Sequence, residues 1–148
     1  VLSREPNSML ALVGEGPLLE HVKQLSIDLG ISNSVLFLGI RSDVASLYQA
    51  FDVFCLPSLY EGLPVVGVEC QASGTPILAS DAITPEIKLT SLMEFEQLSS
   101  SPQKWSEHLI SMRKLNDDPN DSESLKAFDV SAASKRLEDY YSHCLNTV

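Results

Sequence analysis

The sequence predicts an α/β protein built on a doubly wound parallel sheet. Short apolar runs of strand length alternate with helical patterns along most of the chain. Most of these runs are apolar at consecutive positions, so both faces of each strand are expected to be covered, as in a parallel sheet. Right-handed crossovers between parallel strands then place helices on both faces of the sheet.

The strands and helices follow from these patterns in chain order. The expected strands are Met9–Val13, Val35–Gly39, Asp52–Pro57, Pro76–Ser80 and, as the weakest pattern, Ser91–Phe95. The expected helices are Pro17–Leu29, a short one from about Ser42, Pro64–Ser73, Pro102–Leu115 and Ser131–Leu145. Pro17 suits the first helical position, with Leu18, Val22, Leu25 and Leu29 on one face of the helix. Gly30 suits a C-terminal cap, and the segment 116–121 is expected to separate the last two helices.

Composition excludes several classes of protein. The chain has 148 residues, 44% of them hydrophobic, and a formal net charge of −10, so a nucleic-acid-binding surface is not expected. No apolar run approaches the roughly 20 residues that cross a bilayer. Cys55, Cys70 and Cys144 show neither pairing nor metal-ligand spacing, which indicates a reducing compartment. The chain opens at Val1 without methionine, and we expect it to be a piece of a longer protein.

Glu69 lies in the middle of the apolar pattern at Pro64–Ser73, which we expect to be buried on most sides. A buried carboxylate requires a partner. The segment 42–87 contains no Lys or Arg, so a hydroxyl-rich ligand such as the vicinal diol of a ribose is a natural donor. Two other interpretations stay open: Glu69 pairs with a distant Arg, or it caps neighbouring backbone.

Glu61 precedes Gly62 in the loop that leads into the same helix. Gly62 allows unusual backbone torsions and close approach of a ligand. The N–H groups near Leu63 and Val65, with the helix dipole behind them, predict an anion site that suits a phosphate. Glu61 would then reach the group beyond that phosphate. The alternative is that Glu61 is an exposed loop carboxylate with no task.

The remaining motifs are weaker. The turn Gly14–Pro17 lacks the three-glycine dinucleotide fingerprint and the Lys of a P-loop. His21, His108 and His143 are expected to be solvated. No residues show metal-ligand spacing, and no Gly-x-Ser-x-Gly nucleophile motif occurs.

The ordered set of motifs resembles a known family. Seven residues separate Glu61 from Glu69, the spacing of retaining glycosyltransferases. The surrounding motifs that agree, within a match from about Leu10 to Glu86, are Phe37–Gly39, Ala50–Val53, Pro57–Ser58, Glu61–Pro64 and Gly74–Ile77. Together they resemble the C-terminal, nucleotide-sugar-binding domain of family-4 GT-B glycosyltransferases. The segment Ser80–Glu86 is similar to the bacterial exopolysaccharide or capsule enzymes of that family.

The resemblance implies a Rossmann-like domain, the C-terminal half of a GT-B enzyme. The implied reaction moves a sugar from a nucleotide-sugar donor, preferably a UDP-sugar, to a hydroxyl of a saccharide or lipid-linked saccharide acceptor. The anomeric configuration is retained, and neither a metal nor another cofactor is required. The setting implied is bacterial polysaccharide synthesis in the cytoplasm or at the inner face of the membrane.

Site roles follow from the same resemblance. Glu69 corresponds to the carboxylate that binds the donor ribose, and Glu61 to the catalytic carboxylate near the donor sugar. The remaining donor-binding positions are Gly62, Leu63, Pro64 and Val65 at the diphosphate, Gly14 on the phosphate side, Gly39, Ile40 and Arg41 beside the base, and Glu86 near the sugar. Where the family has a Gly-Gly pair before the last carboxylate, this chain has Ala82–Pro85.

The resemblance implies that parts of the family's domain lie upstream of this chain. The Arg and Lys that clamp the diphosphate belong to a first strand–helix unit, which precedes the segment present, as does the acceptor domain. We therefore expect residues 1–148, with a terminal helix in 131–148, to bind donor without catalysing transfer, and any membrane association to come from the missing domain. Two alternatives stay open: a GT-B-fold UDP-sugar epimerase and a non-catalytic nucleotide-binding module.

Overall fold

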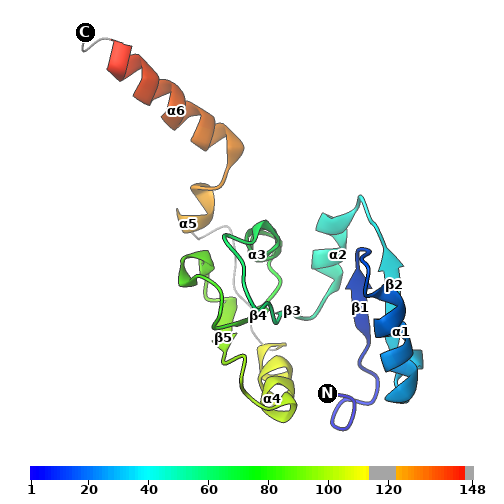
Figure 1. Cartoon of the computed structure of the whole chain (residues 1–148). Helices are drawn as coiled ribbons and strands as arrows, with labels where there is room; N and C mark the ends of the chain where they lie inside the picture. Colours follow the sequence, from blue (N-terminus) through cyan, green and yellow to red (C-terminus); the bar gives the residue numbers. More distant parts are fainter. Residues whose placement is uncertain (114–122, 146–148) are drawn as a thin grey trace. The chain divides into compact units, whose positions relative to one another are not determined.

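The computed structural model describes residues 1–113 and 123–145 of the chain (Figure 1). They form two compact units, Val1–Ser46 and Leu47–Val148. All strand pairs are parallel, and strands alternate with helices in both units, which confirms the α/β class. The strands pair in two groups, β1–β2 in the first unit and β3–β4–β5 in the second.

The first unit pairs two parallel strands beside one helix. Its elements are β1 (Leu10–Val13), α1 (Leu19–Asp28), the 3₁₀ turn η1 (Ser32–Ser34) and β2 (Val35–Gly39). The strand at Val35–Gly39 has the predicted bounds, and Gly30, at φ +67°, follows the end of α1 as expected. The helix begins at Leu19 and not at Pro17. Of the four residues expected on one face of this helix, Leu18, Leu25 and Leu29 are exposed.

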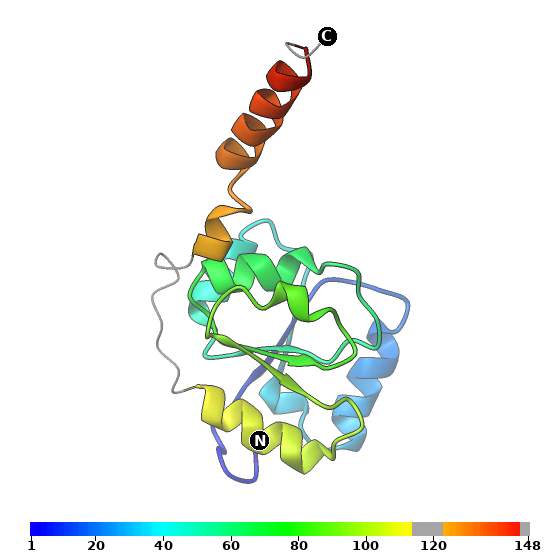
Figure 2. The ribbon, with the colours of Figure 1, turned by 90° about the vertical axis from the view of Figure 1, so that its left-hand side faces the viewer.

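The second unit places helices on both faces of a three-stranded sheet with β4 in the centre. Its elements are α2 (Val44–Ala50, whose first turn lies in the first unit), β3 (Phe54–Leu56), α3 (Val65–Ala72), β4 (Ile77–Ser80), η2 (Pro85–Ile87), β5 (Met93–Glu96), α4 (Pro102–Met112), α5 (Glu123–Lys126) and α6 (Val130–Leu145). In Figures 1 and 2, α3 and α4 cover opposite faces of this sheet. Every residue of β4 is buried as a result, which is the doubly wound arrangement that the sequence predicts.

The predicted elements shift by a few residues at their ends. The fifth strand is Met93–Glu96 where the sequence predicts Ser91–Phe95. The short helix begins at Val44, and the last helix begins at Val130. The helix expected to reach about Leu115 ends at Met112, and the expected break at 116–121 lies outside the described residues.

The expectation that α3 is buried on most sides was wrong. Val65, at the first turn, is 64% exposed, and Glu69 is exposed. Only one side of the helix is buried, the one that carries Gly67, Cys70 and Gln71. Gly67 permits close packing there, because a Cβ at this position would collide with the Ile87 side chain. The apolar side chains on the other side of α3 face solvent.

Gln71 ties α3 to the segment before β5 through a fully buried side-chain amide. Its Nε2 donates to the carbonyl oxygens of Gly67 at 3.0 Å and Ile87 at 2.8 Å. Its Oε1 accepts from the backbone N–H groups of Leu89 and Thr90 and from the Thr90 hydroxyl, each at 3.0 Å. The donors and acceptors of this amide are thereby satisfied, which a buried polar group requires.

Replacing Gln71 with Leu should destabilise the fold. The substitution keeps a side chain of similar size but leaves the backbone groups at Ile87, Leu89 and Thr90 without this partner. We expect the free energy of unfolding to fall by about 2–4 kcal/mol, measured by denaturant titration. The matched control is Gln103→Leu on the exposed side of α4, which should change stability by less than about 0.5 kcal/mol. Equal effects of the two substitutions would contradict the assigned role of Gln71.

Candidate functional site

Glu61 lies in the loop that follows the carboxyl end of β3 and is half-buried. The Ser58 hydroxyl donates to Glu61 Oε1 at 3.0 Å. The Ser80 hydroxyl, at the end of β4, donates to the Ser58 carbonyl oxygen. Glu61 is thus oriented from the carboxyl ends of two adjacent strands, where α/β proteins bind ligands. The half-burial of Glu61 differs from the exposed position that the alternative interpretation supposed.

Glu69 receives a hydrogen bond from Tyr48, whose hydroxyl donates to Glu69 Oε2 at 3.2 Å. This bond links α2 to α3. Within residues 1–113 and 123–145, the Glu69 carboxylate contacts neither of the partners considered from the sequence, a distant Arg or neighbouring backbone. The predicted burial of Glu69 was also wrong, and its exposed carboxylate is accessible to a ligand.

Tyr48 is a rigid donor. It is 4% exposed, and the Thr75 hydroxyl donates to its carbonyl oxygen at 2.6 Å. Its ring meets Phe54 edge to face, with centroids 5.9 Å apart. Burial, and then the negative charge of Glu69, raise the pKa of Tyr48 to about 12. The phenol is therefore protonated at neutral pH and can donate to Glu69.

The amino end of α3 has no side-chain cap. Its N-cap residue is the buried Pro64, which provides no hydroxyl or carboxylate for the first N–H groups. Leu63 and Val65 are exposed beside it, and a Cβ on Gly62 would meet nothing within 4 Å. Gly62 does not adopt a positive φ, so the unusual torsion that its sequence position allowed is not used. The absence of a side chain at Gly62 instead leaves open space beside the amino end of α3.

Other predicted donor-binding positions lie in the first unit. Gly14, at φ +117°, donates its N–H to the carbonyl oxygen of Gly39 at 2.8 Å, and Gly39 itself is at φ +62°. Both glycines adopt backbone conformations that other residues rarely take. Gly14 also lines a groove of about 330 Å³ with Leu12, Val13, Glu15, Gly16, Pro17 and neighbouring apolar residues.

Ile40 and Arg41 follow β2 and are exposed. Arg41 donates to both carboxylate oxygens of Asp43, at 2.8 and 2.6 Å. The hydrogen bonds and charge of Arg41 hold the pKa of Asp43 below its ordinary value. In the second unit, Glu86 is exposed on η2, where its N–H donates to the Thr84 hydroxyl at 3.4 Å.

Sequence reasoning missed a cluster of charges between β5 and α4. His108 Nε2 lies 2.6 Å from Glu94 Oε2, and His108 Nδ1 lies 3.1 Å from Glu96 Oε2. Lys104 Nζ lies 2.9 Å from Glu96 Oε1. The expectation that His108 is solvated was therefore wrong. The spacing of these residues carried a signal. Glu94 and Glu96 are two residues apart in a strand, and Lys104 and His108 are four apart in a helix, so each pair lies on one face of its element.

Three observations concern metals, cysteines and membranes. Within residues 1–113 and 123–145, no group of three or more His, Cys, Asp or Glu side chains is arranged to hold a metal ion. Cys55, Cys70 and Cys144 are free thiols. None of the helices in the described part of the chain combines the length and apolar character needed to span a bilayer.

The charge cluster predicts acid sensitivity. Hydrogen bonds from Lys104 first, and then from Ser100 and His108, lower the pKa of Glu96 from its ordinary 4.5 to about 2. A depressed folded-state pKa stabilises the fold above pH 4.5, and this contribution is lost as the pH falls toward 2. Glu96→Gln should therefore be less stable than the wild type just above pH 4.5, and the difference should shrink steadily on acidification. Urea titrations across this range measure it, and a difference that is independent of pH would contradict the ion-paired state of Glu96.

Comparison with known proteins places the chain in a family. Residues 1–127 match the family described as Glycosyl transferases group 1. The putative glycosyltransferase EpsF of Bacillus subtilis is 47% identical over 78 residues, which are 53% of this chain and 20% of that protein. An Escherichia coli UDP-Gal:alpha-D-GlcNAc-diphosphoundecaprenol alpha-1,3-galactosyltransferase is 38% identical over 77 residues, 51% of this chain and 20% of that protein. The chain thus spans about a fifth of the length of these relatives.

The fold agrees with this match. The structure of Anabaena Alr3699/HepE in complex with UDP superposes with a TM-score of 0.69 at 22% sequence identity, over 93% of this chain and 42% of that one. This chain has the fold of GT-B glycosyltransferases. From the match over residues 1–127 and this architecture, the chain belongs to the group 1 glycosyltransferase family.

Proposed function

We propose that this chain is the nucleotide-sugar-binding part of a retaining, family-4 glycosyltransferase in bacterial polysaccharide synthesis. The donor would be a UDP-sugar, and the acceptor a hydroxyl of a saccharide or lipid-linked saccharide. The observation that carries the proposal is the pair Glu61, on the loop before the uncapped amino end of α3, and Glu69, within α3. Ser58 holds the first carboxylate and Tyr48 holds the second. The E. coli relative is named for a UDP-Gal donor and a diphosphoundecaprenol-linked acceptor, and the Anabaena structure contains UDP.

Glu69 is suited to bind the ribose of the donor. A carboxylate accepts two hydrogen bonds from a vicinal diol, and Glu69 is exposed to a ligand. Tyr48 holds one oxygen of this carboxylate in place without neutralising its charge. The Glu69 side chain is therefore oriented before the ligand arrives, which reduces the entropy lost on binding.

The diphosphate would lie at the amino end of α3. Free N–H groups and the positive end of the helix dipole stabilise an anion there. The same groups would stabilise the charge that develops on the leaving diphosphate, so we propose a reaction that does not use a metal. Glu61, on the loop before this helix, would act at the donor sugar and at the reaction centre.

The rest of the protein would complete the cleft. Arg41 forms an ion pair with Asp43, and the segment 42–87 contains no Lys or Arg that could bind the diphosphate. The Arg and Lys that clamp the diphosphate, and the acceptor side, are therefore proposed to come from the part of the protein beyond this chain. We propose that this chain alone binds the donor weakly, and that transfer, on the cytoplasmic side of the membrane, requires the longer protein.

Glu69→Gln should weaken UDP binding. The neutral amide loses a charge-assisted acceptor for the ribose, so the Kd for UDP measured by calorimetry should rise about 10- to 100-fold. Tyr48→Phe, which leaves the carboxylate but removes its donor, should raise the Kd by a smaller factor, about 2- to 10-fold. The control Glu138→Gln, at an exposed position of α6, should leave the Kd unchanged. If Glu69→Gln resembles this control, the ribose role is wrong.

Glu61→Gln should act on turnover and not on nucleotide binding. In the longer protein, we expect kcat for sugar transfer to fall by a factor of about 10² to 10⁴ with little change in the Kd for UDP. Analysis of the product anomer by NMR tests retention in the same assay. Conversion of the donor sugar without any acceptor would indicate the epimerase instead, and failure of the longer protein to bind any nucleotide sugar would exclude both enzymes.

A further inference from the structure

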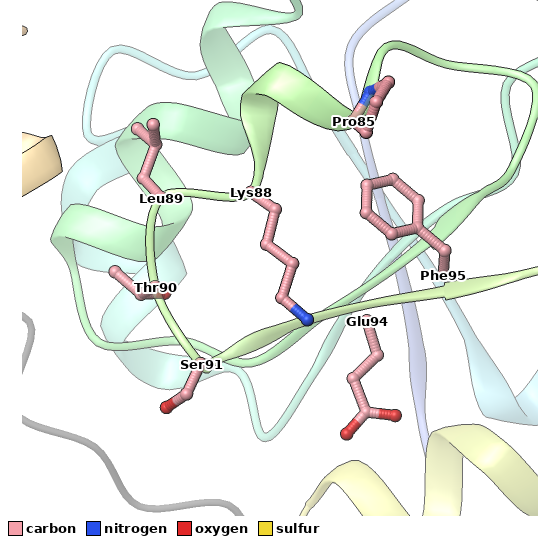
Figure 3. Close-up of a pocket in the computed structure, with 7 residues that line it drawn as sticks. All are labelled: Pro85, Lys88, Leu89, Thr90, Ser91, Glu94 and Phe95. Atoms are coloured by element: carbon pink, nitrogen blue, oxygen red, sulfur yellow. The ribbon is translucent and has the colours of Figure 1, made fainter.

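A second groove, of about 740 Å³, runs along β5 at the outer edge of the three-stranded sheet. Its lining residues are Pro85, Lys88, Leu89, Thr90, Ser91, Glu94 and Phe95. Figure 3 shows the Lys88 side chain extending from the loop toward β5, the strand from which Glu94 and Phe95 project. Its volume lies within the range of small-molecule sites.

The groove is separate from the pair Glu61 and Glu69. Those carboxylates follow β3, whereas the groove borders β5, and these two strands lie on opposite sides of β4. None of the residues that line the groove contributes to the proposed donor site. An inference about the groove therefore does not rest on the proposed function.

The groove is organised before any ligand binds. The N–H and hydroxyl of Thr90 are fixed by the buried Gln71 amide, each at 3.0 Å. The carboxylate of Glu94 is held by His108 at 2.6 Å. The loop wall and the strand wall are thus anchored by different elements, α3 and α4, which is typical of a preformed binding site.

The chemistry of the lining selects a class of ligand. Lys88 contributes an ammonium group and Glu94 a carboxylate, while Phe95 and Pro85 contribute apolar surface. An anion would be repelled by Glu94 and by the chain's net charge of −10, and a small cation by Lys88. A purely apolar ligand would desolvate both charged groups without replacing their hydrogen bonds.

A neutral chain of polyhydroxylated rings that lies across the edge strand β5 can reach Lys88 and Phe95 on one side and Glu94 on the other. Its hydroxyls can donate to the carboxylate of Glu94 and accept from the ammonium of Lys88. Its C–H face can pack against the apolar surface of Phe95 and Pro85. We propose that the groove along β5 is a saccharide-binding site, specific for neutral sugar chains and separate from the donor site.

The test is a titration of the ¹⁵N-labelled chain with maltotetraose and with chitotetraose, followed by ¹H–¹⁵N NMR. Amide signals of Thr90, Ser91, Glu94 and Phe95 should shift, with a Kd in the millimolar range for at least one of the two sugars. Lys88→Met should raise that Kd at least about fivefold. Lys135→Met, an exposed lysine of α6, is the matched control and should not change it.

Several results would overturn the inference. One is the absence of shifts along the groove with both sugars at concentrations well above the millimolar range. Another is an unchanged Kd in Lys88→Met while the spectrum shows a folded protein. Tighter binding of inorganic phosphate than of either sugar at these residues would exclude the neutral class. UDP titrated separately should shift amide signals near Glu69 and not those of the groove residues. Failure of the proposed donor site and failure of the proposed saccharide site therefore give different results.

Discussion

The buried side-chain amide of Gln71 is the interaction on which both candidate sites depend. A buried side-chain amide must find hydrogen-bond partners within the protein. Gln71 finds them in the Gly67 carbonyl of α3, in the Ile87 carbonyl and in the segment Leu89–Thr90. The orientation of α3 sets where Glu69 faces, and the anchored segment forms one wall of the groove along β5. One polar contact between a helix and a loop thereby positions chemistry on both sides of β4.

Four carboxylates of the second unit are held in two different ways. Glu94 and Glu96 contact the imidazole of His108, and Glu96 also contacts the ammonium of Lys104, whose charge compensates its own. Glu61 and Glu69 are contacted instead by the hydroxyls of Ser58 and Tyr48. A hydroxyl orients a carboxylate but leaves its charge available to a ligand. The type of partner therefore separates Glu94 and Glu96, which join β5 to α4, from Glu61 and Glu69, which are suited to contact a ligand. The net charge of the chain does not reveal this difference.

Sequence patterns predicted helices and strands well where the structure of a segment depends on residues close along the chain. The strand at Val35–Gly39 and the glycine stop at Gly30 depend on neighbouring residues alone, and the structure confirms both. The burial of α3 was wrong because apolar composition does not distinguish a helix enclosed on most sides from one packed on a single side. His108 was placed in solvent for a related reason: its partners Glu94 and Glu96 lie on a different element, beyond the reach of helical spacing.

The sequence by itself determined the order of strands and helices, the parallel α/β class and the spacing of Glu61 and Glu69, because each of these depends on residues close along the chain. Only the tertiary structure decided which groups meet those carboxylates. Tyr48 and Glu69 are 21 residues apart, and their contact joins α2 to α3. The groove along β5 likewise combines residues from η2, the following loop and the strand. Such contacts depend on crossover geometry and side-chain packing, which no local period of the sequence encodes.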